Sequence, residues 1–149
     1  YMWQTIGSGA MGPQGPPGVA NIQLYGVNSS HSANICTSTY TLIPDLIKTI
    51  NLTDTATLDI LTTGGIYPNN GGNYYLSPVV YVSIYCNNII LPQTTSNYFA
   101  LNSSWAITTI ITLPPGTYTF DVRAKCNLGC ILAGSSANTQ ASLIIHVFY

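Results

Sequence analysis

Glycine recurs at every third position near the start of the chain, and proline fills several of the positions between. The residues of this repeat are Gly9, Gly12, Pro13, Gly15, Pro16, Pro17 and Gly18. Such spacing suits three polyproline-type chains wound around one another, because only glycine fits at the crowded axis of the three. The repeat therefore predicts that the protein is a homotrimer.

The repeat is too short to hold three chains together by itself. Residues 9–20 span roughly 12 residues at about 3.1 Å each, or about 37 Å in all. Residues 1–8 are expected to be a leader, residues 9–20 the end of a stalk, and residues 21–149 a head domain that supplies the missing stability. One alternative is a single-chain Gly/Pro linker, and another treats residues 7–12 as an artificial leader.

Charge is scarce along the chain. Three Lys or Arg and four Asp or Glu residues give a net charge of −1 in 149 residues. Phosphate binding needs clustered Lys and Arg, so no nucleic-acid partner is expected. The chain also has no apolar run of about 20 residues, so we expect no membrane insertion. Asp121, Arg123 and Lys125 alternate with apolar residues, so these three charges share one face of an expected strand, which must meet water or a polar partner.

Four cysteines permit two disulfides in three pairings; they are Cys36, Cys86, Cys126 and Cys130. Cys86 and Cys126 end apolar strand patterns, where cysteine acts as a small buried hydrophobe, so thiols are favoured. The preferred disulfide is Cys126–Cys130, because a hairpin over residues 127–129 would bring its ends together. A zinc site with His31 or His146 is disfavoured, since there is no second close cysteine pair.

Beyond residue 20 the chain alternates short apolar patterns with turn signals. Period-two alternation is clearest at residues 78–86, 118–126 and 141–149. Residues 46–50 are long enough for one helical turn, but their Thr and Ile favour a strand. The whole pattern predicts roughly eight to ten strands in an all-β, jelly-roll-like antiparallel sandwich.

A triplet stalk followed by a β-sandwich resembles the collagen-stalked trimeric head proteins. These include complement-like and tumour-necrosis-factor-like jelly rolls, spore-surface filament tips, and viral or phage fibre heads. Residues 113–122, Leu-Pro-Pro-Gly-Thr-Tyr-Thr-Phe-Asp-Val, are similar to a Pro-Gly-Thr-Tyr stretch that precedes a strand in such heads. The resemblance covers the architecture of the whole chain and implies a homotrimer. The composition, rich in Ile, Asn, Thr and Tyr, favours a virion fibre of a large DNA virus, a virophage or a phage.

The last strand pattern is apolar on both faces. Leu143, Ile145 and Val147 alternate with a second set, which comprises Ile144, His146 and Phe148. A monomer has difficulty burying both faces, so we expect the second set at the trimer interface. For His146 a structural role is preferred to a metal or pH-sensing ring on the threefold axis. His31 is expected in a solvated loop.

Two segments rich in aromatic and amide side chains are candidates for receptor binding, because rigid β scaffolds present recognition loops. The candidate residues are Tyr67, Asn73, Tyr74, Tyr75, Tyr98 and Trp105. Tyrosine, tryptophan and asparagine suit stacking on sugars and hydrogen bonding to hydroxyls. The favoured alternative is that these aromatic residues cover the core or pack between subunits.

Nothing in the sequence indicates catalysis. Asp54 and Asp59 are not paired by their spacing, and no nucleophile-elbow motif is present. Hard cations need several charged oxygen ligands, so no metal or cofactor is expected. The sequence therefore predicts a structural fibre head on the virion surface that trimerises a collagen-like stalk and attaches to a host-surface glycan or protein. The alternative is a secreted, or spore- or cell-surface, complement-like interaction module.

Overall fold

The computed structural model describes residues 21–69, 79–92, 94–99, 103–127, 129–135 and 140–149. The expected leader and triplet stalk, residues 1–20, lie outside these ranges. The described residues form eleven strands: β1 (Ile22–Asn28), β2 (Ser32–Ile35), β3 (Thr41–Leu52), β4 (Ala56–Pro68), β5 (Val79–Cys86), β6 (Ile89–Ile90), β7 (Ser96–Phe99), β8 (Ser103–Leu113), β9 (Gly116–Cys126), β10 (Ile131–Gly134) and β11 (Ser142–Phe148).

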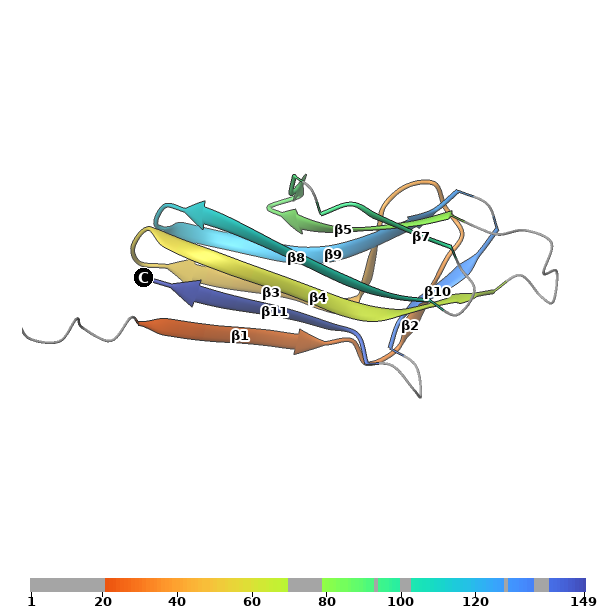
Figure 1. Ribbon diagram of the computed structural model, residues 1–149, viewed down its shortest axis with the longest axis horizontal. Helices are drawn as coiled ribbons and strands as arrows, with labels where there is room; N and C mark the ends of the chain where they lie inside the picture. The colour runs from red at the N-terminus through yellow and green to blue at the C-terminus, as the bar shows by residue number, and fades with distance from the viewer. Residues whose placement is uncertain (1–20, 70–78, 93, 100–102, 128, 136–139) are drawn as a thin grey trace, which may run out of the picture.

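The strands form two antiparallel sheets packed face to face (Figure 1). Sheet A has the order β1-β11-β4-β8, and β10 and β2 extend it beside the far end of β4. Sheet B has the order β3-β9-β5, with β6 and β7 both paired to β5. Successive long strands thus alternate between the sheets in the strand order of a jelly roll. The predicted all-β antiparallel sandwich is confirmed.

The core lies between the sheets and follows the period-two alternation of the sequence. In β11, Leu143, Ile145 and Val147 are fully buried. In β9, Phe120 and Val122 are buried in the same way, while Asp121 between them lies on the opposite side of the strand, where it lines a hollow. Each such side chain contributes about 1.5–3 kcal/mol when it leaves water. The alternation therefore fixes which face of each strand meets the other sheet.

Strand β3 contains an irregularity that shapes the outer face of sheet B. Its register against β9 shifts between Leu42, which faces Arg123, and Ile47, which faces Asp121. Asp45 lies within this bulge with a φ of 63°, a left-handed conformation that Asp tolerates better than most residues. Residues 46–50 are strand, as their Thr and Ile favoured. Between these two register pairs, Val122 of β9 has no partner in β3, while it pairs with Ile84 of β5 on the other edge.

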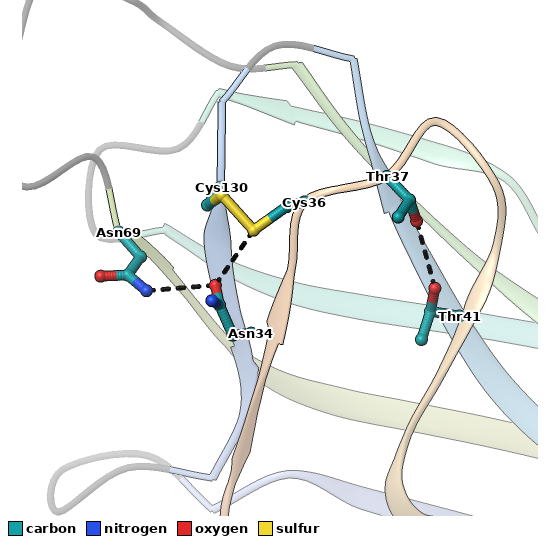
Figure 2. The surroundings of a disulfide bond; sticks show 6 residues. All are labelled: Asn34, Cys36, Thr37, Thr41, Asn69 and Cys130. Atoms are coloured by element: carbon teal, nitrogen blue, oxygen red, sulfur yellow. Dashed lines mark hydrogen bonds between the residues drawn. A yellow bond between two sulfur atoms is a disulfide. The ribbon is translucent and has the colours of Figure 1, made fainter.

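One disulfide joins Cys36, just after β2, to Cys130, just before β10 (Figure 2). The β2–β10 pairing places Ile131 opposite Ile35, so the next pair in the antiparallel register is Cys130 and Cys36. The Cys126–Cys130 pairing preferred from the sequence is wrong, because Cys126 points into the core at the end of β9. The sequence favoured free thiols over disulfides, which is wrong for Cys36 and Cys130 and correct for Cys86 and Cys126, both buried. Burial raises the pKa of the Cys86 thiol.

Replacing both disulfide cysteines, Cys36→Ser with Cys130→Ser, should lower the free energy of unfolding by about 2–4 kcal/mol. The bond closes a long loop, with 94 residues of sequence separation, and so removes much entropy from the unfolded chain. Urea unfolding with and without reductant measures the effect, and reductant should not change the double variant. Thiol titration of the unfolded wild-type protein that finds four reactive groups instead of two would contradict the assignment.

Candidate recognition surfaces

The outer face of sheet A carries an apolar surface centred on β1 and β11. Antiparallel register places Ile22 beside Phe148, and Leu24 beside His146. Ile22 and Leu24 are 55% and 66% exposed, which is unusual for two side chains of this size on one short strand. We call this surface the apolar face; its members are Ile22, Leu24, Leu61, Ile110, Ile144 and Phe148.

His146 and Asp59 form the polar centre of the apolar face. They are register partners on β11 and β4, and His146 Nδ1 lies 3.6 Å from Asp59 Oδ2. His146 Nδ1 is shielded from solvent and has no hydrogen-bond partner among the described residues, and the centre of the imidazole ring lies 6.4 Å from that of the Phe148 ring. Ile144, His146 and Phe148, the predicted interface residues, thus lie together on one outer face. Their contact with other copies stays a prediction.

Trp105 does not belong to a recognition surface, because it is 1% exposed and lies in the core. Its indole Nε1 donates a hydrogen bond to Thr62 Oγ1 at 3.2 Å. Its ring packs over Gly64, where any added Cβ would collide with it. The receptor-binding assignment of Trp105 is therefore wrong, and the alternative, that it covers the core, holds for this residue.

The other receptor-binding candidates are not brought together in the described structure. Tyr67 is half-buried in β4, and Tyr98 lies in β7. Asn73, Tyr74 and Tyr75 lie outside the described residues. His31 is exposed in the turn between β1 and β2, next to Ser30 Oγ at 2.9 Å, as the solvated-loop prediction requires.

A hollow of about 480 Å³ lies on the outer face of sheet B, beside the β3 bulge. We call it the β9 hollow. Its lining combines planar polar groups, hydroxyls and apolar side chains: Tyr40, Leu42, Ile47, Asn87, Asn88, Thr119, Asp121 and Arg123. Its volume falls in the range of about 300–1,000 Å³ that is usual for small-ligand sites.

An ion pair forms the floor of the β9 hollow. Arg123 Nε donates to Asp121 Oδ1 at 2.6 Å and Nη2 donates to Oδ2 at 2.8 Å, a bidentate pair. Asp121 is 3% exposed, and its hydrogen bonds raise the pKa of Arg123. The guanidinium also lies 4.2 Å from the ring centre of Tyr85, a phenol whose pKa is raised by burial. The floor is therefore charged but balanced at neutral pH.

The hairpin between β5 and β6 forms one wall of the hollow. Asn87 and Asn88 have φ values of 49° and 65°, as a two-residue hairpin with both central residues left-handed requires. Asn87 Oδ1 accepts a hydrogen bond from the Thr119 amide at 2.8 Å, and Asn88 Oδ1 accepts one from Arg123 Nη2. The turn residues thus hold their side chains against β9.

Lys125 lies next to the hollow between two tyrosine rings. Its Nζ is 4.7 Å from the ring centre of Tyr40 and 4.9 Å from that of Tyr81. The sequence indicated that Asp121, Arg123 and Lys125 share a face, and the structure confirms it. The sequence did not indicate the tyrosine partners, because they come from β5 and from the segment before β3.

The described residues contain neither a metal-binding cluster nor a membrane-spanning helix. No group of three or more His, Cys, Asp or Glu side chains in the described ranges is arranged to hold a metal ion. Within the same part of the chain, no helix has both the length and the hydropathy needed to cross a membrane.

No protein-family model and no curated protein matches the chain. Among solved structures, a chain of the infectious bursal disease virus particle is 7% identical with a TM-score of 0.44, over 95% of this chain and 39% of that chain. A chain of the Gx strain of this virus is 6% identical with a TM-score of 0.43, over 85% of this chain and 36% of that one. A mutant VP2 protein of the virus is 7% identical with a TM-score of 0.42, over 96% of this chain and 40% of that chain. The chain therefore spans about two fifths of the length of these viral chains.

Replacing Trp105 with Phe should lower the free energy of unfolding by about 1–3 kcal/mol, because a smaller ring leaves a cavity and Thr62 loses a donor. Urea unfolding measures this loss, and Ser104→Ala on the exposed neighbour is the control. A variant as stable as the wild type would contradict the core position of the indole.

Proposed function

We propose that the chain is the trimeric head of a virion fibre, which holds three collagen-like stalk ends in register and attaches the fibre to a host surface. The observation that carries the proposal is the position of the apolar face. Its most exposed strand, β1, begins at Ile22, directly after the triplets of residues 9–20. The proposed stalk therefore leads directly into β1, the strand that carries Ile22 and Leu24 of the apolar face.

A three-chain helix ends with its chains side by side, so it delivers three β1 strands to a common point. Each β1 carries Ile22 and Leu24, more than half exposed, beside the exposed Phe148 of β11. Association of three copies removes these side chains from water, a gain of about 1.5–3 kcal/mol for each one fully buried. Asp59 is the one carboxylate among the register neighbours of these strands, so little charge opposes the association.

The head and the stalk support each other in this arrangement. Four triplets are too few for a stable three-chain helix, so the head keeps the chains close and sets their register. The stalk in turn raises the effective concentration of the heads, because it links them through short segments. The attachment role falls to surfaces that the trimer leaves open, including the outer face of sheet B.

The virion assignment follows the resemblance of the sequence to stalked heads and its composition. The alternative, a secreted or spore- or cell-surface complement-like module, is favoured by one observation, the Cys36–Cys130 disulfide. Disulfides persist mainly outside the reducing cytosol, which suits a cell-surface protein as well as a virion surface.

Leu24→Asp should convert a trimer into monomers, because it places three carboxylates in the proposed interface. Sedimentation velocity at micromolar concentration measures the state of the full chain. Ile89→Asp is the matched control: Ile89 is 70% exposed, close to the 66% of Leu24, but lies on β6 in the other sheet. The control should stay trimeric.

Removing residues 1–20 separates the contributions of stalk and head. The truncated chain should still form trimers, with a weaker association constant. A wild-type chain that sediments as a monomer at micromolar concentration would refute the proposed function. Equal effects of Leu24→Asp and Ile89→Asp would refute the apolar face as the interface.

A further inference from the structure

We infer that the β9 hollow is a binding site for a neutral saccharide, a sugar with adjacent hydroxyls and no carboxylate. The inference deepens the attachment role proposed above and rests on it for its biological meaning. It rests structurally on the ion pair at the floor, on the amides of the β5–β6 turn and on the apolar rim, which are independent of the apolar face.

The hollow offers hydrogen-bond donors that the described structure does not use. Arg123 binds Asp121 and Asn88 through Nε and Nη2, and its Nη1 has no hydrogen-bond partner within the described residues. Asn87 and Asn88 use their side-chain oxygens, and their amide nitrogens have no partner within the same residues. These three nitrogens belong to planar groups of residues that line one hollow, and as donors they match the hydroxyl oxygens of a sugar.

Acceptors and apolar surface complete the lining. Asp121, Thr119 and Tyr40 lie in the same lining. Thr119 Oγ1 shares a hydrogen bond with Thr49 Oγ1, and the Tyr40 phenol accepts one from Ser83 Oγ. Each of these two oxygens keeps capacity for a further hydrogen bond to a sugar hydroxyl, whereas both Asp121 oxygens already accept from Arg123. Leu42 and Ile47 are 39% and 44% exposed at the bulge. Together with the ring of Tyr40 they offer an apolar surface to the C–H groups of a pyranose ring.

Charge balance selects a neutral ligand over an acidic one. The lining contains one cation, Arg123, and one anion, Asp121, held as a bidentate pair. The neighbouring cation, Lys125, is not part of the lining, and its Nζ lies over the rings of Tyr40 and Tyr81. A ligand carboxylate would gain little from Arg123, since it would also approach the Asp121 carboxylate. A neutral sugar uses both partners, because each of its hydroxyls donates and accepts.

The scaffold holds these groups in place before a ligand arrives. The Asn87–Asn88 turn is fixed by its left-handed conformation and by the hydrogen bond of Asn87 to Thr119. Arg123 is fixed by Asp121, by Asn88 and by the ring of Tyr85. Little side-chain entropy is then lost on binding, which favours affinity. The hollow also lies on sheet B, opposite the apolar face of sheet A, so trimers leave it open.

The test uses the full-length chain and a glycan array of neutral and carboxylated oligosaccharides, among them lactose and sialyllactose. Each array hit is then titrated in solution, with backbone NMR shifts as the readout. We expect a neutral member to bind and to shift the amide signals of residues 87, 88, 119 and 123.

Two variants report on the hollow without removing its ion pair. Asn88→Gly keeps the left-handed turn and removes the amide, and Tyr40→Leu removes the ring and phenol. Each should weaken binding about tenfold, the loss that corresponds to about 1.4 kcal/mol. Asn127→Ala, on an exposed amide outside the hollow, is the control and should bind like the wild type.

Absence of any neutral hit, binding confined to carboxylated members, or unchanged affinity of both hollow variants would overturn the inference. Failure here and failure of the proposed function are distinguishable. If the protein is a trimer but binds no neutral saccharide, the saccharide site is refuted and the fibre-head assembly is not. If the protein is a monomer that binds a neutral saccharide through Asn88, the fibre-head assembly is refuted and the saccharide site is not.

Discussion

The hydrogen-bond ladder of β4 is the interaction on which the rest of the fold depends. This strand pairs with β8 along one edge, and with β11 and then β10 along the other. The β11 pairing places His146 beside Asp59 and so sets out the apolar face. The β10 pairing, with β2 beyond it, sets Cys130 opposite Cys36. One strand thereby positions both the candidate interface and the disulfide.

The two outer faces of the sandwich differ in kind. Sheet A presents apolar side chains with little charge, a surface suited to identical copies of itself. Sheet B presents a balanced ion pair, amides and tyrosines around a hollow, a surface suited to a polar ligand. The hollow lies beside the β3 bulge, where Leu42 and Ile47, the register partners of Arg123 and Asp121, supply the apolar part of its lining.

The proposed assembly follows from how little charge the chain has. With seven charged side chains, exposed faces cannot rely on charge for solubility and are better buried against copies. Two of the three cations instead lie on the outer face of β9, where Asp121 and tyrosine rings surround them. Asp121, Arg123 and Lys125 thus lie together on sheet B, whereas Asp59 is the charged residue at the centre of the apolar face of sheet A.

The sequence predicted roughly eight to ten strands, and the described residues form eleven. Local spacing was nevertheless enough to predict the antiparallel sandwich and the inward faces of its clearest strands, because period-two alternation is a local property of each segment. It also placed Cys86 and Cys126 in the core and His146 beside Ile144 and Phe148 on one outer face. Three features follow from the fold alone: the Cys36–Cys130 bond, the burial of Trp105 over Gly64, and the hollow around Asp121 and Arg123. These depend on register between strands distant in the chain, which hydrogen bonding across the sheets sets and local spacing does not contain.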